Sequence, residues 1–144
     1  MSVNFTPVQY ADLNSRQKEA YNFQKVSALL ADFGYSTLRL TDDWNGADFI
    51  AQHKDGKTFL KVQLKSRLCF YEKYSDKELY LCFPNGENWY LYPHDELKTK
   101  VLDHGLMKGT TSWDENSGYS FPRLSKQLEE LLKPYRIPTE PSAD

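Results

Sequence analysis

The chain has 144 residues, a formal net charge of −2 and a sequence pI of about 5.9, and this length fits one domain that buries a sizeable core. With 40% hydrophobic, 15% aromatic and 26% charged residues, the composition excludes a disordered or fibrous protein. The overall charge also excludes a chain that attracts polyanions over its whole surface, so any such site must be local.

The sequence shows no sign of export or membrane insertion. Residues 1–14 lack the basic and apolar regions of a signal peptide, and no apolar run approaches the length of a membrane span. Cys69 and Cys82 have no metal-ligand spacing with another Cys or His. We therefore expect a cytoplasmic protein without membrane contact.

A single domain is expected over residues 1–144. Its first helix runs from Asn14 or Ser15 to about Asp32, because apolar residues recur there with a helical period. Gly34 ends this helix, since glycine takes the left-handed conformation without a clash. The apolar positions are Ala20, Phe23, Val26, Ala28, Leu29, Leu30 and Phe33. Residues 1–13 form an irregular arm that can pack through Phe5, Val8 and Tyr10, and residues 138–144 form a flexible tail.

Extended segments follow the first helix. We place strands at residues 35–40, 47–53, 58–66, 79–83 and 88–92, with connections at 41–46 and 54–57. Pro93 opens a helix over about 94–102, residues 103–120 are a loop, and 123–133 is a helix closed by Pro134. This order predicts an α+β fold with a mostly antiparallel sheet whose central hairpin is covered by the first helix.

The Asp55-Gly56 turn fixes the register of the central hairpin. With the turn centred there, Asp48 lies opposite Gln63, and directly opposed residues project from the same face. The two-residue period of a strand adds Lys65 to this face. One face of the hairpin is thus expected to gather an aspartate, a glutamine and a lysine.

The opposite face of the third strand carries Leu60, Val62 and Leu64, which we expect to pack on the first helix. The polar side chains would then point away from that helix. A half-exposed strand with alternating polar residues has the same pattern, and Asp48 could simply end a turn. The residues alone leave a functional site and a solvated strand face equally open.

The stretch from Asn22 to Arg67 resembles the PD-(D/E)XK restriction-endonuclease-like superfamily. The matching segments are FGY at 33–35, GADFIA at 46–51 and KVQLKSR at 61–67. The likeness is to small bacterial nucleases and intron-encoded homing endonucleases whose third motif is QxK. It implies a restriction-endonuclease-like core with the order αβββ and then ββα, in a mixed, mostly antiparallel central sheet flanked by helices.

The resemblance implies a role for each matched residue. Asp48 and Gln63 would be catalytic and would bind Mg²⁺ or Mn²⁺ through side-chain oxygens, and the backbone carbonyl of Leu64 would complete the shell. Lys65 would position or activate the attacking water. Such a set suits the chemistry, because a hard cation prefers oxygen ligands and a neighbouring lysine neutralises developing charge.

This chain departs from the superfamily pattern at two places. Gln63 replaces the usual glutamate and removes one negative charge from the site. In the first helix, Phe23 and Gln24 occupy the region where active members often carry a glutamate, and Glu19 lies one turn earlier. Glu19 is therefore kept as a fourth catalytic candidate beside its plainer interpretation as a solvated carboxylate near the start of a helix.

The partner implied by the resemblance is DNA. Ser66, Arg67 and Lys61 would contact the phosphate backbone, and basic residues outnumber acidic ones between Lys54 and Lys77. A homodimer could pool two such basic patches. The three histidines, His53, His94 and His104, are interpreted as surface residues or caps, and Tyr71, Tyr74, Trp89 and Trp113 as packing residues rather than base-stacking ones.

Three functions follow from these features. The first is a metal-dependent endonuclease-like protein that hydrolyses DNA. The second is a catalytically inactive protein of the same fold that binds nucleic acid or a protein partner, which the neutral Gln63 favours. The third is a structural subunit whose aromatic surface forms an obligate interface.

Overall fold

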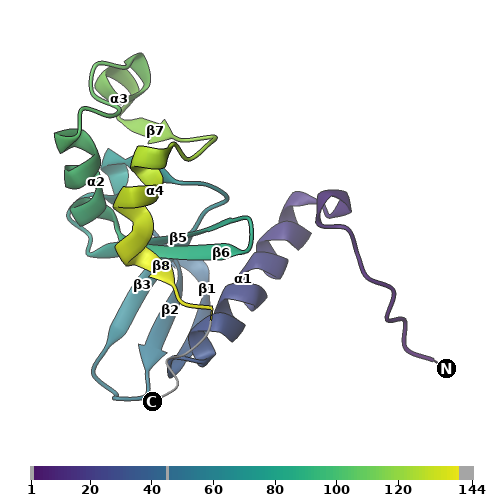
Figure 1. Ribbon diagram of the computed structural model, residues 1–144. Coiled ribbons are helices and arrows are strands. Elements are labelled where there is room, and N and C mark those ends of the chain that lie inside the picture. Colours follow the sequence, from purple (N-terminus) through teal and green to yellow (C-terminus); the bar gives the residue numbers. More distant parts are fainter. Residues whose placement is uncertain (1, 45, 140–144) are drawn as a thin grey trace.

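The computed structural model describes residues 2–44 and 46–139, and Figure 1 shows its helices and strands. The α-helices are α1 (Ser15–Ala31), α2 (His94–Asp103), α3 (Thr111–Asn116) and α4 (Lys126–Leu132). The strands are β1 (Tyr35–Trp44), β2 (Ala47–His53), β3 (Phe59–Leu64), β4 (Cys69–Tyr71), β5 (Leu79–Asn85), β6 (Asn88–Pro93), β7 (Gly118–Ser120) and β8 (Arg136–Ile137). Short 3₁₀ helices lie at Tyr10–Asp12, Glu72–Tyr74 and Lys133–Tyr135.

The main sheet has six strands in the order β1-β2-β3-β5-β6-β8. Only the β3–β5 pair is parallel, and the other neighbours are antiparallel. Strands β4 and β7 form a separate two-stranded sheet. The expected α+β fold with a mixed, mostly antiparallel sheet flanked by helices is confirmed.

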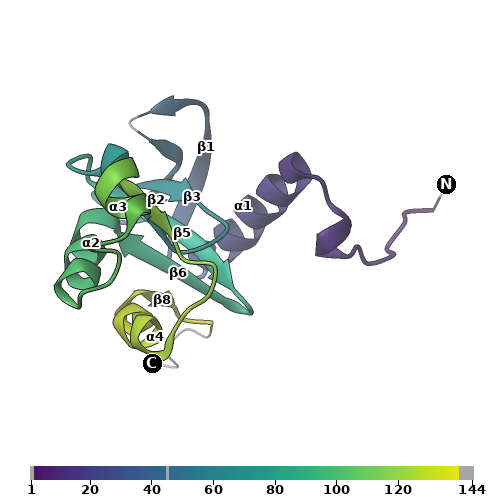
Figure 2. The same ribbon diagram turned by 90° about the horizontal axis from the view of Figure 1, so that it is seen from above.

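Each face of the main sheet carries its own core, and Figures 1 and 2 show α1 on one side with α2 and α4 on the other. The α1 side buries Val26 and Leu30 of the helix against Phe49 of β2 and Val62 of β3. The other side forms a larger aromatic core between β5, β6, α2 and α4. Packing on both faces therefore holds the strands of the sheet, including their ends, in place.

The central hairpin has the predicted register. Phe49 pairs with Val62, and the pairing continues to Gln52 and Phe59. Asp55 accepts hydrogen bonds from the backbone N–H groups of Lys57 (2.7 Å) and Thr58 (2.9 Å). These bonds, with the Thr58 hydroxyl, lower the pKa of Asp55 to about 2, so the turn keeps its charged carboxylate.

Helix α1 begins and ends as the sequence indicates. The Asn14 side chain accepts a bond from the Gln17 N–H, and the Gln17 side chain accepts one from the Asn14 N–H. Gly34 has a φ of +87° and closes the helix. Among the predicted apolar positions, Ala28 is exposed, whereas the polar Asn22 is buried and donates to the Tyr10 hydroxyl.

Several predicted segments differ from the structure. Residues 103–120, expected to be a loop, contain α3 and β7, because β7 pairs with the distant β4. Strand β1 extends through most of the expected 41–46 connection, and β3 ends at Leu64 rather than at Ser66. Helix α4 begins three residues later than expected, where the Ser125 hydroxyl accepts a bond from the Leu128 N–H.

The N-terminal arm does not pack down as expected. Phe5 is 86% exposed and Val8 is 64% exposed, and the arm extends away from the domain in Figures 1 and 2. Tyr10 contacts α1, through its hydroxyl and through its ring beside Tyr21. Most of the expected flexible tail, from residue 140 onward, lies outside the described residues.

The α1-side core yields a stability prediction. Phe49→Ala should lower the free energy of unfolding by about 3–5 kcal/mol, because it leaves a cavity beneath α1. The matched control is Leu38→Ala on the edge strand β1, where the side chain is 66% exposed, with an expected change within about 0.5 kcal/mol. Urea denaturation followed by circular dichroism measures both, and equal losses would contradict this packing.

Candidate functional site

The candidate site begins where the pairing of β2 with β3 ends. Phe49 and Val62 form the last pair of this ladder at that end. Beyond it, the Leu64 N–H donates a 2.8 Å hydrogen bond to Oδ2 of Asp48. The carboxylate of Asp48 therefore lies against the β3 backbone between the two other residues of the predicted motif, Gln63 and Lys65.

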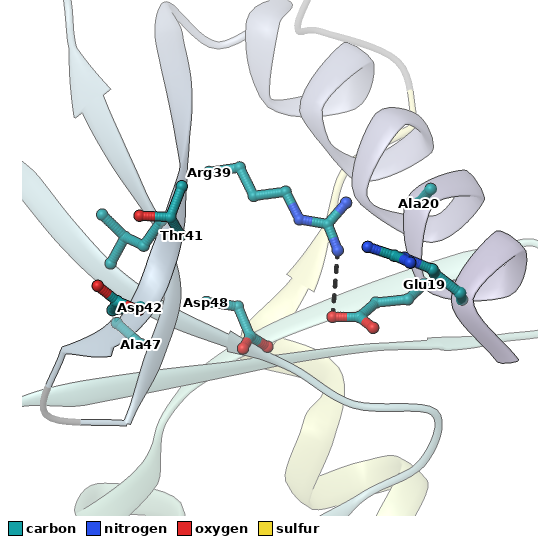
Figure 3. Close-up of a pocket in the computed structure, with 9 residues that line it drawn as sticks. Glu19, Ala20, Arg39, Thr41, Asp42, Ala47 and Asp48 are labelled. Carbon is teal, nitrogen blue, oxygen red and sulfur yellow. Dashed lines mark ion pairs between the residues drawn. The ribbon is translucent and has the colours of Figure 1, made fainter.

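Strand alternation is interrupted at Asp48. Ala47 packs in the aromatic core, whereas Phe49, two residues later, packs in the core beneath α1. Asp48 consequently lines a cavity of about 510 Å³ together with Glu19 and Ala20 of α1. Figure 3 shows the carboxyl groups of Asp48 and Glu19 pointing into the same space. The expectation that Asp48 points away from the first helix is therefore wrong.

Glu19 is close to the site but has a partner of its own. Its Oε1 lies 3.1 Å from the Arg39 guanidinium, and the two side chains are 53% and 42% exposed. The dashed line in Figure 3 marks this ion pair. Arg39 also lies over the Phe23 ring. Glu19 thus faces the same cavity as Asp48 while its charge is balanced by an arginine.

Lys65 directly follows Leu64 at the end of the β2–β3 pairing, the place that we call the junction, and it borders a different cavity from Asp48. Lys65 and Ser66 line a second cavity, of about 440 Å³, together with Leu64 and Glu19. The backbone N–H of Lys65 donates to the Cys82 carbonyl at 2.8 Å, which fixes the residue to β5. Glu19 therefore borders both cavities, and the N-terminal half of α1 spans the distance between Asp48 and Lys65.

The Lys65 ammonium lies against two tyrosines. Its Nζ is 5.5 Å from the Tyr71 ring centroid and 5.3 Å from that of Tyr74. Burial lowers the pKa of Lys65, but a hydrogen bond with Tyr74 and the electrostatic effects of the Tyr74, Cys69 and Tyr71 side chains outweigh burial, so the pKa lies above its ordinary 10.5. Lys65 is accordingly a cation at neutral pH, suited to charge stabilisation rather than to proton abstraction.

The remaining predicted residues are placed less directly. Gln63 is half-buried and pairs with Leu81 in the β3–β5 ladder. Lys61 donates from Nζ to the Lys77 carbonyl at 2.5 Å. Ser66 and Arg67 are exposed just past Lys65. The structure thus brings Asp48, Leu64, Lys65 and Glu19 to one junction, whereas Gln63 lies beside Leu81 on β3, on the strand face opposite Val62.

Sequence reasoning missed the buried support behind the two tyrosines. His94 is fully buried, so its interpretation as a surface residue or cap is wrong. Its Nε2 accepts the Tyr71 N–H at 3.1 Å, and its Nδ1 therefore carries the proton donated to Asp95 at 2.8 Å. The Tyr74 ring packs edge-on against the imidazole. The feature of the sequence that could have indicated a buried His94 is the Pro-His-Asp segment at the start of α2.

The available donors fit a hard cation better than zinc. No group of three or more His, Cys, Asp and Glu side chains within residues 2–44 and 46–139 could hold a metal ion. The side chains of Asp48 and Gln63 and the backbone carbonyl of Leu64 can each ligate a metal ion through oxygen. This set suits Mg²⁺ or Mn²⁺, which retain waters and take further ligands from a phosphate.

Comparisons with known proteins return one structure to report. No known family model matches the chain, and a search of curated proteins finds no match. The chain is similar to Hjc, a Holliday junction resolvase from the archaeal hyperthermophile Archaeoglobus fulgidus, with 15% identity and a TM-score of 0.44. The likeness covers 54% of this chain and 74% of that one.

Within the described part of the chain, no helix is both long and apolar enough to cross a bilayer.

Buried His94 gives a pH prediction. Burial lowers the pKa of His94 below its ordinary 6.5, against the raising effect of Asp95. Just below pH 6.5 the unfolded chain therefore binds more protons than the folded chain does. The contribution of neutral His94 to stability should be complete above pH 6.5 and should decline as the pH falls toward about 5. Lys98 and Glu72, which also face the imidazole, act on its pKa in opposite directions.

His94→Phe should remove this component of the pH dependence. At about pH 7.5 it should also cost about 1–3 kcal/mol, because the Tyr71 N–H loses its acceptor. Urea denaturation at both pH values measures these effects, and His104→Gln on the exposed end of α2 is the control. An unchanged pH dependence in His94→Phe would refute the buried neutral imidazole.

Proposed function

We propose that this protein is a metal-dependent endonuclease-like hydrolase of DNA, with a QxK form of the PD-(D/E)XK site. The supporting observation is the junction at the end of the central hairpin, where the Asp48 carboxylate meets the Leu64 backbone next to Lys65. Asp48, Gln63 and the Leu64 carbonyl would hold Mg²⁺ or Mn²⁺. With Asp48 as the one acidic ligand, the ion would depend on substrate phosphate for tight binding.

In the proposed reaction, water attacks the phosphorus of a phosphodiester and one P–O ester bond breaks. A bound divalent ion would make that water more nucleophilic and offset charge on the phosphate. The ammonium of Lys65 would orient the water and stabilise charge that develops on the phosphate oxygens. Glu19 borders the same cavities, where it can accept a hydrogen bond from the water.

The substrate would be held by residues beyond β3. Ser66 and Arg67 follow Lys65 directly and are exposed, so they can contact the phosphate backbone of DNA. Lys61 was predicted as a third contact, but its ammonium is engaged by the Lys77 carbonyl. We assign it the weaker role of adding positive charge. A homodimer would present two such surfaces to one duplex.

A catalytically inactive, nucleic-acid-binding protein is the second candidate. The favouring observations are that Glu19 is paired with Arg39 and that Gln63 is neutral, so the site carries less negative charge than a glutamate-based one. Both candidates predict DNA binding, and only the first predicts hydrolysis that depends on Lys65.

The first test is cleavage of supercoiled, linear and branched DNA with Mg²⁺ or Mn²⁺. Lys65→Ala and Asp48→Asn should each lower the cleavage rate by about 100-fold or more, because each removes charge at the reacting phosphate. Lys57→Ala, an exposed lysine on the hairpin turn, is the control and should cut like the wild type. Equal cleavage by all variants would point to a contaminating nuclease and reject the proposal.

Gln63→Glu tests the second ligand. It adds a carboxylate to the oxygen set, so half-maximal cleavage should need about tenfold less Mg²⁺. Gln52→Glu, on β2 and away from the junction, controls for added charge. A Mg²⁺ requirement that shifts equally in both variants would remove Gln63 from the metal site.

A further inference from the structure

Among the residues that the structure describes, three cations gather beside the proposed active site without an ion pair to a carboxylate. Lys73, on the 3₁₀ helix after β4, places its Nζ 5.4 Å from the Tyr71 ring centroid and 5.2 Å from that of Tyr74. Lys65 lies over the same two rings. Within the described residues, no ion pair joins Lys65, Lys73 or Arg67 to an acid.

The nearest acidic side chain in sequence is already engaged. Glu72 precedes Lys73, but its carboxylate lies 3.3 Å from the Lys98 ammonium, which also donates to the Ser75 hydroxyl at 2.7 Å. Two ammonium groups gathered on one pair of rings repel each other, and an aromatic face offsets only part of that repulsion. The arrangement favours an anion between them.

Two of these cations, Lys65 and Arg67, line a cavity of about 280 Å³ together with Ser66, Cys69, Tyr71 and Ser120. Burial raises the pKa of the Cys69 thiol to about 11, although the positive charges of Lys65, Lys73 and Arg67 each lower it. Lys73 and Lys65 lie over the same Tyr71 ring, which also lines this cavity, so the three cations border one region although Lys73 comes from a different element.

The two tyrosines are held rigidly from behind. Their rings lie edge to face at a centroid distance of 5.7 Å. Strand β4 is fixed by the Tyr92 hydroxyl, which donates to the Cys69 carbonyl at 2.7 Å, and by His94 at the Tyr71 N–H. Gly118 lies so close that an added Cβ would be 2.3 Å from the Tyr71 ring. The cations therefore rest on a preformed support.

We propose that Arg67, Lys73 and Lys65, supported by Tyr71 and Tyr74, form a phosphate-binding subsite for a DNA strand beside the scissile position. Lys65 belongs to both sites, since it lines the cavity with Glu19 as well as this one. The subsite deepens the proposed nuclease function and names the surface along which the strand runs. Arg67 would supply a forked donor, and Lys73 a point charge.

The experiment measures binding of a fluorescent DNA duplex by anisotropy in EDTA, at several KCl concentrations. Arg67→Gln and Lys73→Gln should each weaken binding about two- to fivefold, the range of an exposed ion pair. Each should also reduce the slope of log affinity against log salt by about one. Lys57→Gln, at the far end of the hairpin, removes the same charge and should match the wild type.

Gly118→Ala tests the support without changing charge. Its Cβ must displace the Tyr71 ring, so duplex affinity should fall although Arg67 and Lys73 remain. Circular dichroism confirms folding; should this variant not fold, the two charge variants still decide. The subsite is refuted when Arg67→Gln and Lys73→Gln bind with wild-type affinity and salt slope, or when the protein binds inorganic phosphate tightly but no duplex.

Binding in EDTA separates this proposal from the proposed hydrolysis. Loss of affinity in the charge variants, with no cleavage by the wild type in Mg²⁺, would support the subsite and reject the nuclease. Cleavage by the wild type that Arg67→Gln and Lys73→Gln leave unchanged in rate and affinity would reject the subsite alone.

Discussion

The pairing of β2 with β3 is the constraint on which the candidate site depends. The Asp55 carboxylate fastens the turn through the Lys57 and Thr58 N–H groups, and this sets Phe49 opposite Val62. A slip by one residue would carry both side chains out of the α1-side core. Because the core holds this register, the Leu64 N–H meets the Asp48 carboxylate at the end of the ladder. Burial of apolar residues on one face thus determines where the polar atoms beyond it lie.

The sequence was informative where structure is set by neighbours along the chain. The hairpin register, the cap at Asn14 and the stop at Gly34 follow from local turn and helix chemistry, and all three are confirmed. The direction of Asp48 was not predictable in the same way. Regular alternation would place Asp48 on the face away from α1. Ala47 packs in the aromatic core whereas Phe49 packs in the core beneath α1, and this difference breaks the alternation. In that aromatic core Ala47 joins residues that are distant in sequence, among them Leu79 and Tyr74.

The structure of segment 103–120 and the burial of His94 were also not predictable from the sequence, because both depend on contacts between residues that are far apart along the chain. Strand β7 has only three residues, and it exists because β4 offers it a partner about fifty positions earlier in the chain. His94 is buried because β4 and the following 3₁₀ helix fold over the start of α2, where Asp95 also accepts the Asp76 N–H. No period in the sequence marks these contacts, since each joins single residues of short elements. The packing behind Tyr71 and Tyr74 therefore could not be predicted from the sequence.

The charge of the chain also has to be considered region by region. The formal net charge of −2 argues against general attraction to DNA, yet two acidic groups near the site are engaged internally. Glu19 pairs with Arg39, and Glu72 pairs with Lys98. Lys65, Lys73 and Arg67 have no such carboxylate among the described residues, so positive potential concentrates at the end of β3. An acidic protein can in this way present a basic surface beside Asp48, where it would offset the repulsion between the Asp48 carboxylate and the proposed phosphodiester substrate.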